Sequence, residues 1–180
     1  MKMKAVILIL VFVTLSFTSI NAQVAKAGSV GLGIGVPYGV VGINGEFAVH
    51  KYFSLSAGLG SSIFSGLGYA VGARAYLKPA ENKWRPRISM HYGVNGVIAS
   101  QESFGSSSYS GKTFSGLTLG LGTLVMFGER RKYGFDFEVV YLATQGGLQD
   151  EIDKMNASGK YSHIDDPSKI KVVIGYRFGF

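Results

Sequence analysis

The sequence of 180 residues contains no cysteine, so the protein has no disulfide and no thiol through which a lipid could anchor it. Proline is scarce, with 4 residues, whereas glycine is abundant, with 26. Aromatic residues make up 13% of the chain. Disordered chains are poor in aromatics and collagen requires glycine at every third position, so both classes are excluded. The stability of the protein must therefore come from the packing of a folded domain.

Long apolar runs are also missing from most of the chain. The exception is the start, where Met1–Lys4, with two lysines, precedes the apolar run Ala5–Ile20. This arrangement predicts a signal peptide over residues 1–22, because the run is short for a membrane anchor and a small residue precedes the expected cleavage position. Residues 23–180 have the length of one domain. They contain no apolar stretch of the roughly 20 residues that a spanning helix needs, so a membrane protein with this sequence has to be a β-barrel.

Basic clusters with interleaved aromatics are absent too, although the net charge is +7. Nucleic-acid-binding proteins typically carry such a basic patch. In an exported protein, an excess of positive charge favours contact with anionic lipid headgroups instead. We therefore expect lipids as partners and no nucleic acid.

What the sequence does contain is a regular alternation of side chains. In residues 170–180 the bulky residues fall on every second position, which is the pattern of a β-strand with two different faces. The same pattern recurs upstream and predicts eight strands in all, at residues 30–36, 41–49, 53–60, 69–77, 87–98, 117–127, 135–141 and 170–180. An even number of strands of about 8–11 residues is typical of a transmembrane barrel.

The predicted connections differ between the two ends of this barrel. One set is short, at residues 50–52, 78–85 and 128–133, and holds many basic residues. The other set comprises residues 37–40, 61–68, 99–116 and 142–169, and its last loop is rich in aspartate. Short turns at one end and longer loops at the other are typical of outer-membrane barrels. Aromatics near both ends, Tyr52, Trp84 and Tyr133 at one and Tyr38, Tyr69 and Tyr141 at the other, are interpreted as interfacial belts.

The two faces of the strands have different compositions. One parity carries mostly Leu, Phe, Tyr and Val, and the other carries mostly Gly, Ser and Ala with a few charges. The interior of an eight-stranded barrel is only just wide enough for side chains, so we assign the bulky parity to lipid and the small parity to the lumen. The predicted polar lumen network is Glu46, Arg74, Arg87, His91, Asp136, Glu138, Lys171 and Arg177. We expect these charges to pair in a filled interior without a continuous water pore.

The last strand resembles the β-signal that the barrel assembly machinery reads, with Phe180 at its end and Ile174, Tyr176 and Phe178 at alternating positions before it. With this strand, residues 23–180 resemble the small outer-membrane β-barrel proteins of the OmpA transmembrane-domain or OmpX type. The resemblance implies an all-β, eight-stranded antiparallel up-and-down transmembrane barrel after a cleaved signal peptide. It also implies the outer membrane of a Gram-negative-type bacterium as location, with outer-membrane lipids and the barrel assembly machinery as partners. It does not imply one activity, because this fold carries several.

Other motifs fit ordinary structural roles better than chemistry. Ser89 and His91 share one strand face and an acid could complete a triad, but we expect them in the lumen as satisfied polar residues. The stretch Gly105–Thr113 has five residues between its glycines where a phosphate-binding P-loop needs four. The acidic residues of 142–169 lack the spacing of a calcium loop, and the three histidines lack that of a zinc site. We therefore expect no enzyme activity, cofactor or metal.

The function expected from the sequence is that of a non-enzymatic outer-membrane barrel with a filled polar lumen. It would contribute to envelope integrity or to surface interactions through loops 99–116 and 142–169, the second of which is predicted to form a helical turn at Leu148–Met155. One alternative is a lipid-modifying outer-membrane enzyme using Ser89 and His91. The other is a soluble, exported, lipocalin-like binder of an apolar ligand, which requires the bulky parity to face inward.

Overall fold

The computed structural model describes residues 28–62, 66–101, 109–128, 132–158 and 167–180. The predicted signal peptide lies outside these residues. The described residues form eight strands: β1 (Gly28–Gly35), β2 (Val40–His50), β3 (Phe53–Ser62), β4 (Gly66–Tyr76), β5 (Trp84–Gln101), β6 (Tyr109–Phe127), β7 (Tyr133–Leu142) and β8 (Ile170–Gly179). They also include a short 3-10 helix, η1 (Val36–Tyr38), and an α-helix, α2 (Leu148–Ser158).

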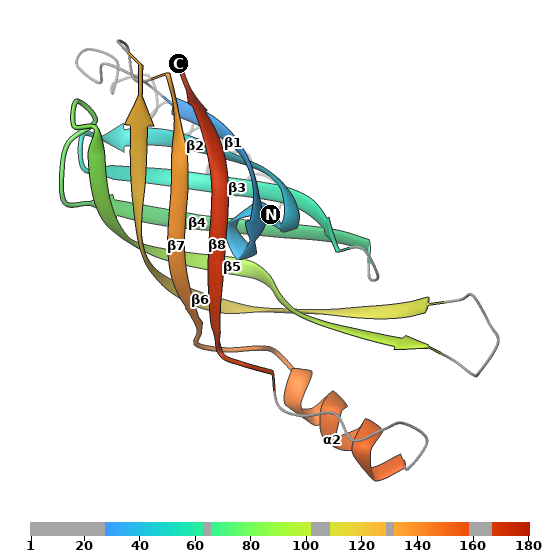
Figure 1. Cartoon of the computed structure of the whole chain (residues 1–180). Coiled ribbons are helices and arrows are strands. Elements are labelled where there is room, and N and C mark those ends of the chain that lie inside the picture. Colours follow the sequence, from blue (N-terminus) through green and yellow to red (C-terminus); the bar gives the residue numbers. More distant parts are fainter. Residues whose placement is uncertain (1–27, 63–65, 102–108, 129–131, 159–166) are drawn as a thin grey trace, which may run out of the picture.

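Each strand pairs antiparallel with the next, and β8 pairs antiparallel with β1 to close the barrel. The closing register places Leu32 opposite Tyr176 and Gly33 opposite Gly175. Figure 1 shows the ring of strands, with α2 beyond the same end of the barrel toward which β5 and β6 extend. The predicted eight-stranded antiparallel up-and-down barrel is therefore confirmed. Its strands could be predicted because the period of two that defines each strand is a property of the local sequence.

Most large apolar side chains point away from the barrel. Side chains that are 43–72% exposed occur on every strand and include Leu32, Ile43, Leu59, Leu67, Val71, Ile88, Leu121, Phe135 and Ile174. The residues between them face the lumen and are mostly small or polar. The lipocalin-like alternative required the opposite orientation, so the structure contradicts it.

Strands β5 and β6 are longer than predicted. Residues 99–116 were expected to form a loop, but β5 continues to Gln101 and β6 begins at Tyr109. A β-bulge between Val94 and Gly96 shifts the pairing with β6. A bulge changes the face on which later residues lie. The alternation is already broken at the start of the bulge, because Val94, which was predicted to face lipid, is buried with 2% of its surface exposed.

Helix α2 packs against the extended β5–β6 hairpin. Leu148 and Ile152 form an apolar cluster with Phe114 of β6, and Ile98 of β5 packs against it. The helical turn predicted at Leu148–Met155 is thus part of a longer helix. Within the described segments, no helix has the length and apolar character needed to cross a membrane.

Candidate functional site

The centre of the lumen is filled by charged side chains from five strands. Glu46 comes from β2, Arg74 from β4, Arg87 from β5, Asp136 and Glu138 from β7, and Arg177 from β8. Their side chains are 0–6% exposed. Charges buried to this extent require partners, because an unpaired buried charge is very costly. The alternation of each strand places the six side chains in one interior, where they can pair.

Asp136 is the central acceptor of this network. It forms an ion pair with Arg87 and lies 3.8 Å from Nη2 of Arg74. Its Oδ2 lies 3.4 Å from Nη1 of Arg177 and accepts a hydrogen bond of 3.0 Å from the hydroxyl of Tyr38. One carboxylate on β7 therefore connects strands β4, β5 and β8.

Glu46 forms a second centre on the other side of the arginines. It pairs with Arg74, and its Oε2 lies 3.4 Å from Nη2 of Arg177. Its Oε1 accepts hydrogen bonds from the hydroxyls of Tyr76, at 2.6 Å, and Ser54, at 2.7 Å. The two carboxylates thus share Arg74 and Arg177, which makes the network continuous across the lumen.

Glu138 extends the network along β7. Its Oε2 accepts a hydrogen bond of 2.6 Å from Arg87, and its Oε1 accepts one from the hydroxyl of Ser89. His91 lies beside it, with Nε2 3.6 Å from Oε1 of Glu138. Ser89 and His91 are 7% and 1% exposed. The hydroxyl that a nucleophile would need is therefore directed at a carboxylate in the filled interior.

Lys171 is the predicted lumen residue that lies apart from these charges. It is near the start of β8, at the end of the barrel with the long loops, and it is exposed. Strand parity gives the face of a residue but not its height relative to the barrel wall. Without Lys171, the network balances three arginines against three carboxylates.

A segment that was predicted to be an external loop instead enters the lumen. Tyr38, at the end of η1, is 0% exposed and reaches Asp136, so it is not the interfacial aromatic that the sequence suggested. Asn44 holds the turn from below by donating a 2.8 Å hydrogen bond to the carbonyl of Pro37. Gly39 has a left-handed φ of 64°, and Val40 has a φ of 84° that β-branched residues rarely adopt.

Glycines on the neighbouring strands make the space for Tyr38. A Cβ atom on Gly175 would lie 2.1 Å from the Tyr38 hydroxyl, and one on Gly33 would lie 2.7 Å from its ring. With Val36, Val140, Leu142 and Val173, Tyr38 forms an apolar layer above the charges. The glycine-rich lumen parity was the sequence signal for this insertion, but it did not identify which side chain would occupy the space.

A second apolar layer closes the short-turn end of the lumen. It consists of Tyr76, Leu124 and Met126, which are 2–6% exposed. The charged network therefore lies between two apolar layers, each tied to it by a tyrosine hydroxyl. This arrangement is a packed interior, as expected for eight strands.

The proposed assembly-signal residues lie on the outer wall. Ile174, Phe178 and Phe180 are 53%, 50% and 70% exposed, whereas Tyr176 is partly buried. The ring of Tyr176 packs edge-on against Phe135 of β7, with 5.3 Å between centroids, and against Phe178, with 5.0 Å. The contact with Phe135 also stabilises the junction between β7 and β8.

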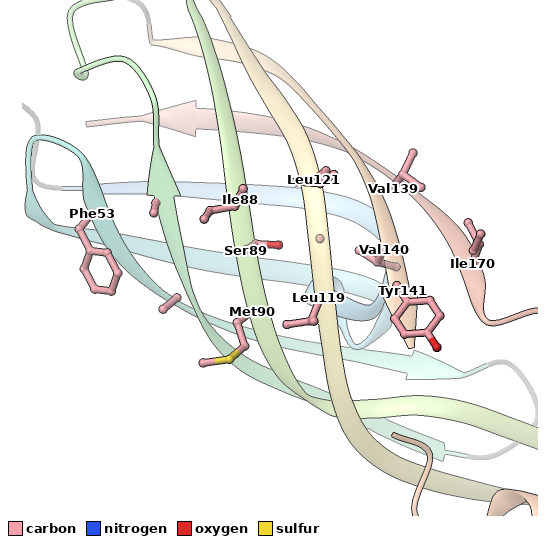
Figure 2. Close-up of a pocket in the computed structure, with 13 residues that line it drawn as sticks. Phe53, Ile88, Ser89, Met90, Leu119, Leu121, Val139, Val140, Tyr141 and Ile170 are labelled. Atoms are coloured by element: carbon pink, nitrogen blue, oxygen red, sulfur yellow. The ribbon is translucent and has the colours of Figure 1, made fainter. Parts of the chain in front are cut away.

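An apolar groove of about 670 Å³ lies on the outer wall. Figure 2 shows side chains of β3, β5, β6, β7 and β8 around it, among them Ile88, Met90 and Leu119. Ala73 and Ala75 of β4 are also part of its lining, and their small side chains leave room between the bulky ones. Its lining is mainly that of the apolar belt, and it also includes Ser89, whose hydroxyl donates to Glu138.

Outside the barrel wall, an ion pair joins α2 to the hairpin. Nζ of Lys112 lies 2.9 Å from Oε2 of Glu151. The hydrogen bond and charge of Lys112 lower the pKa of the Glu151 carboxyl below its ordinary value. Within the described residues, no group of three or more His, Asp or Glu side chains is arranged to hold a metal ion.

Comparison with solved structures identifies a similar fold. The structure resembles the crystal structure of the N-terminal β-barrel domain of Pseudomonas aeruginosa OprF, with a TM-score of 0.53 and 12% sequence identity. The similarity covers 86% of this chain and 98% of that one. At this identity it shows a shared barrel fold. No protein-family model matches the sequence, and no curated protein matches it either.

Proposed function

We propose that the protein is a non-enzymatic, integral outer-membrane β-barrel of the OmpA transmembrane-domain or OmpX type. The observation that carries this proposal is the inversion of the barrel, with apolar side chains on its outer wall and ion pairs inside. A closed barrel satisfies every backbone hydrogen bond between its strands, which a bilayer demands. The barrel fold that the chain shares with the OprF domain supports the same location.

The ends of the barrel support this orientation in a bilayer. Tyr52, Trp84 and Tyr133 are exposed near the short turns, and Tyr69 and Tyr141 are exposed near the long loops. Such aromatics prefer the interface between lipid and water. At the short-turn end, Lys51 and Lys78 lie over the rings of Tyr52 and Trp84, at 5.2 and 5.8 Å. Basic groups there would contact anionic headgroups, and the resemblance of β8 to a β-signal makes the barrel assembly machinery a further partner.

The role we propose is structural, in envelope integrity or surface contact. Loops on a rigid scaffold are where such a barrel can bind partners. The described ends of β5 and β6, up to Gln101 and from Tyr109, form a projection together with α2, and Phe114 and Leu148 hold the two parts together. This projection could present one surface to a partner, whereas the packed lumen gives a substrate no route inward.

Fractionation of cells that express the full chain tests the location. We expect the protein in the outer-membrane fraction, with a different mobility in detergent gels before and after heating, because a closed barrel resists detergent. Recovery in the soluble periplasm would contradict the proposal. Planar-bilayer recordings of the purified protein should show no large, stable conductance.

The lipid-modifying alternative is tested separately with a Ser89→Ala variant. Ser89 lies in the filled interior and is bonded to Glu138, so we expect unchanged acylation of lipid A by mass spectrometry in cells that carry the variant. A loss of lipid modification with normal assembly of the barrel would support an enzyme instead.

A further inference from the structure

The mouth of the barrel at the long-loop end contains a pocket that the proposed structural role does not use. Its volume is about 330 Å³, at the lower end of the roughly 300–1,000 Å³ of ligand-binding pockets. Its lining comes from β1, η1, β2, β5, β8 and the segment around the start of α2. The pocket lies above the layer that Tyr38 closes, so its occupant would not need to pass through the lumen.

The walls of this mouth pocket are mainly apolar. Val36, Val94 and Leu148 line it and are 7%, 2% and 3% exposed. Val97 adds a side chain that is 37% exposed. The position of Val36 depends on the inward turn of η1, and that of Val94 on the bulge of β5, two features that the sequence did not reveal. An aliphatic chain would find a surface of matching chemistry here.

One residue that lines the mouth pocket has a buried acceptor without a partner in the described part of the chain. Asn95 lines the pocket, and its Nδ2 donates to the carbonyl of Thr144 at 2.8 Å and to the hydroxyl of Thr118 at 3.2 Å. The carbonyl of Thr144 can only accept, which fixes Nδ2 on that side of the amide. Oδ1 of Asn95 is buried and accepts no hydrogen bond within the described residues. Buried acceptors are normally satisfied by protein or by water, so this atom has the capacity to accept a hydrogen bond that the described residues do not supply.

The rim of the mouth pocket carries a positive charge. Lys171 lines it and is exposed, outside the balanced network of the lumen. Lys171 is the charged residue among those that line the pocket, and Asn95 and Gln145 contribute amide side chains. The combination of an apolar wall, an unsatisfied acceptor and a cation defines the chemistry of a ligand.

We propose that the mouth pocket binds a hydroxylated aliphatic carboxylate. Its alkyl chain lies against Val94, Val97 and Leu148, its hydroxyl donates to Oδ1 of Asn95, and its carboxylate faces Lys171. A free hydroxy acid offers all three groups, whereas a hydroxyacyl chain of a lipid offers the alkyl chain and the hydroxyl but no carboxylate, because its carboxyl carbon is esterified or amidated. The site requires the closed barrel but not a particular location, so it stands or falls separately from the proposed function.

Binding is tested with 3-hydroxydecanoate as the probe. The full mature chain, labelled with ¹⁵N, is placed in phosphatidylcholine nanodiscs, because detergent would compete for an apolar pocket. We expect saturable shifts of the Gly96 and Val97 amides. We also expect weaker binding of decanoate, which lacks the donor for Asn95, and of the methyl ester of 3-hydroxydecanoate, which lacks the charge. Absence of saturable shifts, or equal affinity for all three compounds, would overturn the proposal.

Two variants and one control assign the binding to these residues. Lys171→Gln should weaken 3-hydroxydecanoate binding by about five-fold, the effect of one exposed ion pair. Val97→Trp should abolish binding by filling the pocket. Lys169→Gln removes a neighbouring exposed lysine that does not line the pocket, and it should bind as the wild type does. Unchanged affinity in both Lys171→Gln and Val97→Trp, with the barrel shown intact by its heat-dependent gel mobility, would contradict the assignment.

The source of the ligand is separated by changing the bilayer. If lipopolysaccharide in the nanodisc competes with 3-hydroxydecanoate, a hydroxyacyl chain without a free carboxylate is the occupant, which contradicts the proposed contact between a carboxylate and Lys171. If the affinity is unchanged, the occupant is a free acid.

Discussion

The hydroxyl of Tyr38 donates a 3.0 Å hydrogen bond to Asp136, a residue 98 positions later in the chain. This bond joins the turn after β1 to the centre of the lumen network on β7. Arg177 approaches both groups, with Nη1 3.5 Å from the Tyr38 hydroxyl and 3.4 Å from the Asp136 carboxylate. The turn is therefore held inside the barrel by the same charges that fill it.

Replacing Tyr38 with alanine should both destabilise the barrel and open its upper layer. Removal of a fully buried aromatic costs about 3 kcal/mol of unfolding free energy. We expect a lower denaturant midpoint and ion-conducting openings in planar bilayers that the wild type lacks. Tyr141→Ala, which removes an exposed ring from the outer wall, serves as the control and should remain closed. A Tyr38→Ala barrel as silent as the wild type would show that Tyr38 is not needed for closure.

Replacing Arg177 with methionine should destabilise the protein by about 3–5 kcal/mol, because Asp136 and Glu46 would each lose a buried partner. The measurement is equilibrium unfolding in urea with lipid or detergent present. Lys171→Gln provides the matched comparison, since this side chain is exposed on the same strand. Equal losses in the two variants would mean that the interior charges are not mutually stabilised.

Much of this architecture could be predicted because alternation is a local property. Each strand shows its two faces in its own sequence, so the positions of Glu46, Arg74 and Asp136 followed from parity alone. The entry of Tyr38 into the lumen did not follow, because it depends on space that Gly33 and Gly175 leave on other strands. Such space exists only after the barrel closes.

The hairpin and the bulge were missed for different reasons. Residues 99–116 are rich in Ser and Gly, which weakens the strand pattern, although β5 and β6 pair there as far as Gln101 and Tyr109. The bulge between Val94 and Gly96 shifts the pairing of β5 with β6 by one residue, and the amino-acid composition of the strand does not reveal it. Lys171 has the parity of the lumen, but it lies too near the end of its strand to reach the network. Its position along the barrel axis becomes known only from the three-dimensional structure.

Adding a side chain at Gly175 should displace Tyr38. Its Cβ would lie 2.1 Å from the Tyr38 hydroxyl, so Gly175→Val cannot retain the present turn. We expect a stability loss of about 3 kcal/mol, comparable to that of Tyr38→Ala, and no further loss when the two changes are combined. Gly45→Val is the control, because the nearest atom to its Cβ is 3.9 Å away. If the stability losses of Gly175→Val and Tyr38→Ala were fully additive, Gly175→Val would act through contacts other than those with Tyr38.

Titration of Glu151 tests the contact between α2 and the hairpin. Because Lys112 lowers its pKa in the folded state, the pair contributes stability above the unfolded pKa and loses it as the pH falls through the folded one. NMR of the side-chain carboxyl should therefore show a midpoint below that of free glutamate. Lys112→Gln should raise this midpoint toward the ordinary value, whereas Lys154→Gln, a lysine on the same helix, should change it less. An unchanged midpoint in Lys112→Gln would mean that α2 does not dock in this way.

Deletion of Phe180 tests the resemblance of β8 to an assembly signal. The ring is 70% exposed, so its loss removes little packing, although its backbone N–H donates to the carbonyl of Gly28 at 3.1 Å. We expect normal export but reduced insertion, measured as the fraction with heat-dependent gel mobility in the outer membrane. Phe180→Tyr should insert normally because it keeps an aromatic ring and the backbone bond, whereas Phe180→Ala should resemble the deletion. If Phe180→Ala assembled as the wild type does, the defect of the deletion would come from the lost Gly28 contact rather than from recognition of the aromatic.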